Sequence, residues 1–154
     1  MTKIFEACAT DLHRLTALAR EFAACEMADP DGAATNWHAG TCELLRNGMA
    51  RVFFCTDNDD LMGRPVGLLA VLVVPHPWTL SVQVHEQLWF VTQEYRDTPV
   101  GFALVRHLDG VASDLGASQI LITHLYNEVG ERLRRILPRY GYRPLEINYT
   151  KEVN

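Results

Sequence analysis

The stretch that most constrains the fold of this chain runs from Val82 to Gly116. Its first part alternates in the period of a strand, with one apolar face that also carries a carboxylate. That face comprises Val82, Val84, Glu86, Leu88 and Phe90. The pair Thr98-Pro99 then predicts a helix start, because threonine caps helices and proline suits the first helical position.

The helix that follows carries one apolar stripe at four-three-four spacing, and Gly116 is expected to end it. The stripe comprises Leu104, Leu108, Val111 and Leu115. A strand that turns directly into a helix N-terminus presents backbone N–H groups at the positive end of the helix dipole. The stretch therefore predicts an anion-binding site.

Periodicity and turn residues predict further elements on both sides of this unit. We expect a turn-rich break at Ala28–Ala34 and a polar hairpin turn at Asp57–Gly63. The expected helices are one capped by Thr10, one at Asn36–Leu45 and one at Glu128–Tyr140. The other expected strands are Lys3–Ala9, Arg51–Thr56, Pro65–Val74, Gln119–Thr123 and Arg143–Val153. The resulting order is β-α-α-β-β-β-α-β-α-β.

Length and composition fit a single domain over residues 1–154, with 48% hydrophobic and 21% charged residues. The longest apolar run, Val66–Val74, is too short for a membrane span. The N-terminus lacks a secretory pattern, so we expect a cytoplasmic protein without membrane partners. Four cysteines without a C-x-x-C pair predict reduced core thiols and no metal site. The net charge of −5 argues against nucleic acid as a partner.

The segment Leu88–Gly101, LWFVTQEYRDTPVG, resembles the central motif of the GNAT acyl-CoA N-acetyltransferases. Val91, Arg96 and Gly101 match that motif, whereas Gln93 stands in place of its proline and Pro99 in place of its middle glycine. The tail also resembles the family's ending, with Tyr140-Gly141-Tyr142 followed by Tyr149 and Lys151. The order of elements agrees with the family along essentially the whole chain.

This resemblance implies a GNAT fold of the α+β class, with a central mixed, mostly antiparallel sheet flanked by helices. It implies an N-acyltransferase that uses acetyl-CoA and acts on a primary amine of a small molecule or protein. A second hypothesis is a non-catalytic GNAT-fold module that binds acyl-CoA, and a third is an interaction protein that keeps only the fold. The acceptor amine stays unidentified, and a homodimer is left open.

The resemblance places coenzyme A on the strand end and the helix start. The implied contacts are Phe90, Val91, Arg96, Asp97, Thr98, Val100, Gly101, Phe102 and Asn127. Arg96 and the amides of the first helical turn suit pyrophosphate, and Gly101 permits close backbone approach. Pro99 cannot donate an N–H, and Thr98 competes for the same amides if it caps the helix. The N–H of Val91 is expected to polarise the thioester carbonyl.

Amine attack on a thioester also needs a base, and Glu86 is the first candidate because a carboxylate on an apolar face should have a raised pKa. The alternative is a structural Glu86 at a strand end or in an ion pair. His85, on the opposite face, is the reserve base, and His76 ranks below it. Trp37, Trp78 and Trp89 are candidates to wall an acceptor pocket, or else core residues.

The family's usual general acid is a tyrosine, and its position here is Leu137. Tyr140, Tyr126 and His124 are candidate substitutes, although Tyr140 is expected to pack in the core. A thiolate is a fair leaving group unaided. The arginines of the Glu128–Tyr140 helix fit a solvated face near a helix C-terminus better than a second phosphate site.

Overall fold

The computed structural model describes residues 2–124, 128–146, 148–151 and 153. Its residues form two compact units, Met1–Ile122 and Thr123–Asn154. The first unit contains the sheet, and the second contains the C-terminal helix.

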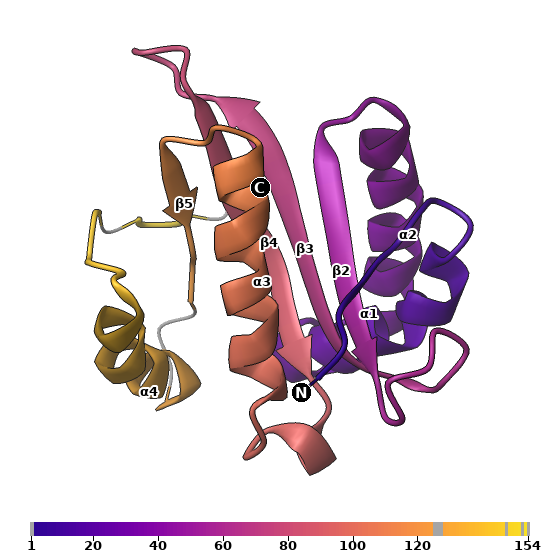
Figure 1. Cartoon of the computed structure of the whole chain (residues 1–154). Coiled ribbons are helices and arrows are strands. Elements are labelled where there is room, and N and C mark those ends of the chain that lie inside the picture. The colour runs from indigo at the N-terminus through magenta and orange to yellow at the C-terminus, as the bar shows by residue number, and fades with distance from the viewer. Residues whose placement is uncertain (1, 125–127, 147, 152, 154) are drawn as a thin grey trace. The chain divides into compact units, whose positions relative to one another are not determined.

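The first unit is built on a five-stranded sheet in the order β1-β2-β3-β4-β5 (Figure 1). The strands are β1 Phe5–Glu6, β2 Ala50–Thr56, β3 Pro65–Pro75, β4 Val82–Val91 and β5 Gln119–Leu121. Neighbouring strands are antiparallel except β4 and β5, which are parallel. The expected mixed, mostly antiparallel sheet of the α+β class is confirmed.

Helices cover both faces of this sheet (Figure 1). They are α1 Leu12–Glu26, α2 Pro30–Arg46 and α3 Val100–Asp114. On the face covered by α1 and α2, the apolar core contains Leu15, Phe54, Leu68, Leu88 and Phe90. On the face covered by α3, it contains Phe53, Leu69, Val84, Leu104 and Leu108. Three residues of the expected stripe, Leu104, Leu108 and Val111, are therefore buried, and Leu115 is partly buried against them. Gly116 ends that helix region with φ +64°.

The predicted break at Ala28–Ala34 is wrong, because α2 already begins at Pro30. Asp29 caps this helix, and its carboxylate accepts a hydrogen bond from the Gly32 N–H at 3.0 Å. Proline at the first helical position completes a regular start. The turn residues of this segment thus begin the helix, which runs well before the expected Asn36.

Two further boundaries near the N-terminus differ from expectation. Helix α1 begins at Leu12, and Asp11 rather than Thr10 is its N-cap residue. The Asp11 carboxylate accepts the Cys8 N–H at 2.9 Å, and its hydrogen bonds with Cys8 lower the pKa of Asp11. This turn shortens the first strand to Phe5–Glu6. Cys8 is exposed, as is Cys25, so only Cys42 and Cys55 are core thiols.

The second unit contains α4 Glu128–Ile136 and a 3-10 turn at Leu137–Tyr140, which Gly141 ends with φ +85°. The expected helix to Tyr140 changes its winding where Pro138 lacks an N–H. The predicted strand Arg143–Val153 is wrong for the described residues in that range, which form no strand. All of the described residues in that range are exposed, so they lack the burial that drives strand pairing.

Candidate functional site

A β-bulge at Gln87 divides strand β4. Leu88 lies opposite Ala70, but Glu86 lies opposite the next residue, Val71, so Gln87 is the extra residue. An extra residue exchanges the two faces of the strand beyond it. Val84 accordingly packs on the α3 face, whereas Leu88 packs on the α1/α2 face.

The prediction that Glu86 shares a face with Leu88 and Phe90 is therefore wrong. Glu86 pairs with Val71 and lies on the α3 face, where its side chain is 8% exposed. His85 lies on the opposite face from Glu86, as expected, and its Nε2 contacts the Gln83 carboxamide oxygen at 3.1 Å. The catalytic roles of Glu86 and His85 stay predictions.

One edge of the second half of β4 is open, in the sense that no strand among the described residues pairs with it. β5 pairs only with Gln83, Val84 and His85 of β4. On the other edge, the Thr92 N–H donates to the Val66 oxygen at 3.0 Å. Hydrogen-bonded and non-bonded pairs alternate in an antiparallel ladder, so the preceding residue, Val91, which lies opposite Gly67, points its N–H and C=O away from β3. The same alternation directs the Trp89 N–H to the open edge, a donor that sequence reasoning missed.

Arg96 lies directly beside this open edge. Its Nε donates to the Val91 carbonyl oxygen at 3.1 Å, and its guanidinium lies 5.4 Å from the centre of the Phe90 ring. A guanidinium has five N–H donors, and the Val91 bond uses one of them. Phe90 itself is buried against Phe22 of α1. Arg96 is thus held in place at the end of β4 by two of the residues that the resemblance assigned to the cofactor.

The turn between β4 and α3 contains a 3-10 turn at Gln93–Tyr95 and then Asp97 and Thr98, which are exposed. Thr98 Oγ donates to the Tyr95 oxygen at 2.6 Å and accepts the Val100 N–H at 3.4 Å. Pro99 is the N-cap residue and Val100 the first helical residue, so the expectation that Thr98 is the cap residue and Pro99 the first helical residue is wrong by one position. Thr98 therefore competes only weakly for the first helical amide.

The start of α3 packs against the open half of β4. A Cβ built on Gly101 would lie 3.5 Å from Val91 Cγ2 and 3.6 Å from Trp89 Cζ2. The Phe102 ring meets the Trp89 ring edge to face at 5.8 Å. Gly101 thus brings the helix start to the strand that carries the two edge-directed N–H groups.

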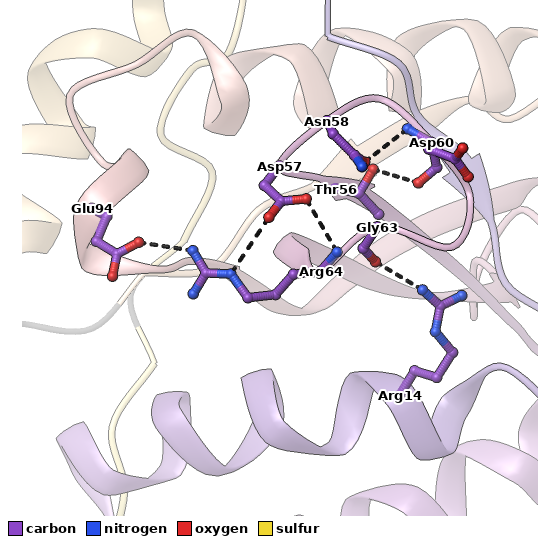
Figure 2. Close-up of polar contacts among 8 residues, drawn as sticks. All are labelled: Arg14, Thr56, Asp57, Asn58, Asp60, Gly63, Arg64 and Glu94. Carbon is purple, nitrogen blue, oxygen red and sulfur yellow. Dashed lines mark hydrogen bonds and ion pairs between the residues drawn. The ribbon is translucent and has the colours of Figure 1, made fainter.

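The turn is also tied to the hairpin turn Asp57–Gly63 (Figure 2). Arg64 donates to Glu94 at 2.8 Å, and its backbone N–H donates to Asp57 at 3.1 Å. From α1, Arg14 donates to the Gly63 carbonyl at 2.8 Å. The hydrogen bond to Glu94 raises the pKa of Arg64, which therefore stays charged. Sequence reasoning missed this network because its members lie far apart in the chain.

A buried hydroxyl lies where β4 ends. Thr92 Oγ is buried, and among the described residues it has no hydrogen-bond partner. Buried polar atoms are normally paired, so this unpaired hydroxyl just after β4 is a candidate contact for a polar ligand.

The three tryptophans lie in different surroundings. Trp37 lines two hollows between the helices and the α1/α2 face of the sheet. Trp89 packs on the α3 face, and Trp78 is 89% exposed in the loop after β3. In the same loop, His76 Nδ1 accepts the Trp78 and Thr79 N–H groups, so this imidazole holds a turn.

The second unit contains the remaining sequence-predicted site residues. Asn127 and Tyr126 lie outside the described residues. Leu137 is buried, but Tyr140 is 38% exposed, so the expectation that Tyr140 packs in the core is wrong. The helix bears acidic residues in its first turn and Arg134 and Arg135 in its last, as the helix dipole favours.

The described part of the chain lacks two further kinds of feature. Its histidine, cysteine, aspartate and glutamate side chains form no group of three that could hold a metal ion. None of its helices combines the length and the apolar character needed to cross a bilayer.

No protein-family model and no curated protein matches the sequence. Solved structures do resemble the fold. An aminoglycoside acetyltransferase from an uncultured soil metagenomic sample has TM-score 0.80 and 15% identity, with 100% of this chain and 99% of that chain covered. A ribosomal-protein-alanine N-acetyltransferase from Brucella melitensis biovar Abortus 2308 has TM-score 0.74 and 18% identity, with 100% of both chains covered.

A transcriptional regulator from Bacillus halodurans C-125 is also similar, with TM-score 0.78, 14% identity and coverage of 99% and 100%. Identities this low establish the fold alone. Many of the similar structures are GNAT acetyltransferases, and this chain has the GNAT fold.

Proposed function

We propose that the protein is an N-acyltransferase that moves an acyl group, acetyl by default, from coenzyme A to a primary amine. The observation that carries this proposal is the open edge of β4 beside the start of α3. Two edge-directed N–H groups, an arginine and a helix N-terminus converge there. Such a row of donors suits an extended acyl carrier that ends in phosphates.

The residues present fit coenzyme A in three respects. The amides of the first turn of α3 and the Arg96 guanidinium suit pyrophosphate. Gly101 keeps the helix start clear of a side chain. Thr92 supplies a buried hydroxyl that lacks a partner among the described residues. Pro99 is the feature that fits least, because its nitrogen cannot donate to phosphate.

The chemistry would then be an acyl transfer in which the amine nitrogen attacks the thioester carbon. The new C–N bond forms, the C–S bond breaks, and the electron pair leaves on sulfur. The edge-directed N–H groups of Val91 and Trp89 would stabilise the negative charge that develops on the carbonyl oxygen. The ammonium proton would pass to the Glu86 carboxylate, directly or through one water.

The test is release of free thiol from acetyl-CoA with a panel of amines, in wild type and in Glu86→Gln. This substitution keeps the size of the side chain and removes its basicity. It should lower turnover by roughly 10²–10⁴ with nearly unchanged coenzyme A affinity. The wild-type rate should also fall as the pH drops and a carboxylate takes up a proton. Wild-type turnover and an unchanged pH profile in the variant would make Glu86 structural and His85 the better candidate.

The same experiment, together with a melting-temperature measurement, distinguishes the transferase from a non-catalytic module that only binds acyl-CoA. A module that only binds would raise its melting temperature with coenzyme A yet release no thiol with any amine. A domain that keeps only the fold would show neither effect. Thiol release that depends on an added amine is the result that supports the transferase.

A further inference from the structure

Two adjoining hollows lie on the α1/α2 face of the first unit. The larger, of about 220 Å³, is lined by α2 and by strands β2 to β4. The smaller, of about 130 Å³, is lined by α1, α2 and β4. Trp37 and Gln87 line both, so these two side chains are shared by both hollows.

The chemistry of the lining is uniform. Every residue that lines either hollow is uncharged, and most are apolar. The polar side chains are Asn36 and Thr41 at the larger hollow and Gln87 at both. A cavity of about 150 Å³ admits a benzene-sized ring, so the larger hollow has room for one ring on a short chain. A polycation would find no carboxylate among these lining residues.

An uncharged apolar lining also acts on the amine itself. Removing an ammonium from water is costly, so such surroundings favour the neutral amine. The neutral amine is the form that attacks a thioester. The site would thus assist the proton loss that acyl transfer needs, before any base acts.

Gln87 connects these hollows to the reacting region. It is the bulge residue of β4, directly after Glu86 and two residues before Trp89, whose N–H faces the open edge. Two strand residues span about 7 Å. A ring held beside Gln87 would therefore place an amine on a two- or three-atom chain near the thioester. The Gln87 carboxamide can both donate and accept, which orients a neutral polar group.

We infer that the acceptor is a primary amine on a compact, uncharged apolar body, such as one aromatic ring on a short chain, seated between Trp37 and Gln87. This inference rests on the proposed function, because it names the acceptor class for that reaction. Gln87 and Trp37 are then the residues that decide acceptor specificity.

The experiment compares 2-phenylethylamine with spermidine, using wild type, Trp37→Ala and Gln87→Glu. Trp78→Ala is the matched control, because Trp78 is an exposed tryptophan of the first unit outside both hollows. Two readouts are taken: kcat/KM for each amine, and calorimetric binding of each amine without acetyl-CoA. The second does not require turnover.

Wild type should prefer 2-phenylethylamine over spermidine by at least about tenfold in kcat/KM. Trp37→Ala should weaken its binding by at least about tenfold, and Trp78→Ala should not. Gln87→Glu adds a carboxylate beside the hollows and should shift the preference toward spermidine. The KM for acetyl-CoA should change little in all three variants.

The outcomes distinguish this inference from the proposed function. Equal or better use of spermidine by wild type would overturn the acceptor class and leave the transferase standing. Binding of 2-phenylethylamine that is the same in wild type and Trp37→Ala would also overturn it. Binding that requires Trp37, without thiol release from any amine, would support the apolar site and count against the transferase.

Discussion

The two halves of β4 have the same neighbour on one edge and differ on the other. Before Gln87, the strand pairs with β3 on one edge and with β5 on the other. After Gln87, it still pairs with β3, but β5 has ended. The first half is thus held as an interior strand, and the second presents backbone donors along an edge that β5 does not cover.

The bulge also exchanges the faces of the two halves. In the first half, Val84 packs against the α3 core, and Gln83 is turned toward the other face, where it donates to Gln119. In the second half, Leu88 packs against the α1/α2 core, and Trp89 is turned toward α3. Because of this one extra residue, both halves of the strand bury apolar side chains, the first half in the α3 core and the second in the α1/α2 core.

Deletion of Gln87 should have the largest effect, because it removes the bulge that makes the two halves of β4 differ. A regular strand would drive the first half to its opposite face, which moves Val84 out of its core and the Gln83 amide into it. Each buried polar group left unpaired costs about 1–3 kcal/mol, and a small domain is stable by only about 5–15 kcal/mol. We expect the melting temperature to fall by at least about 10 °C.

Gln87→Ala is the matched control for that deletion, because it keeps the extra residue and loses only an exposed side chain. Its melting temperature should lie close to that of wild type. A deletion variant as stable as Gln87→Ala would show that the register of β4 does not depend on the bulge.

Gly101→Glu should have the next largest effect, which we expect on coenzyme A binding beside the open half of β4 and not on folding. Gly101 lies at the start of α3 against Trp89 and Val91, so a carboxylate there would meet the pyrophosphate. We expect the rise in melting temperature with coenzyme A to vanish, which corresponds to a loss of at least about a hundredfold in affinity. Without ligand the variant should melt as wild type does.

Gly101→Ala separates crowding from charge in this test. Its Cβ would make ordinary contacts at 3.5 to 3.7 Å, so it should fold and still bind coenzyme A. An unchanged ligand-induced shift in Gly101→Glu would remove the assignment of this turn to pyrophosphate.

The sequence predicted the second half of β4 better than the first. Leu88 and Phe90 are buried on one face as their spacing indicated, and the turn and α3 follow them. Reading Val82 to Phe90 as one uninterrupted alternation placed Glu86 on the wrong face, because a bulge leaves no mark in a period-two pattern. The Asp29-Pro30 pair was likewise read as a break when it is a helix start.

The site was predictable where it depends on local chemistry and not where it depends on register. Arg96 and Gly101 stand out in the sequence, and they do lie beside the end of β4. The Trp89 N–H and the Arg64–Glu94 pair depend on which strand ends where and which loops meet. Those are tertiary facts that no local pattern encodes.

A smaller effect is expected from Pro99, the N-cap residue of α3, which cannot donate a backbone N–H beside the open half of β4. Pro99→Gly and Pro99→Ala both restore an amide next to the helix start. If it donates to phosphate, coenzyme A should bind up to about tenfold more tightly by calorimetry. Pro99→Ala should bind coenzyme A at least as tightly as Pro99→Gly, because glycine loses more backbone entropy on ordering. Weaker binding in both variants would mean that proline organises the turn.

The smallest effect is expected from the ion pair that joins the turn after β4 to the hairpin turn. Arg64 joins Glu94 of the turn to Asp57 of the hairpin (Figure 2). Exposed ion pairs are weak and screened by salt, so Arg64→Ala should weaken coenzyme A binding by less than about fivefold. That difference should vanish at 1 M salt, where the screening length is about 3 Å.

Arg46→Ala is the control for Arg64→Ala, because Arg46 forms an exposed ion pair with Glu43 within α2. It should leave coenzyme A affinity unchanged at every salt concentration. A loss that persists in 1 M salt would mean that Arg64 supports the turn through packing, since screening removes only the charge interaction. The open half of β4 would then depend on the hairpin for its shape, and the difference between the two halves would extend beyond β4 itself.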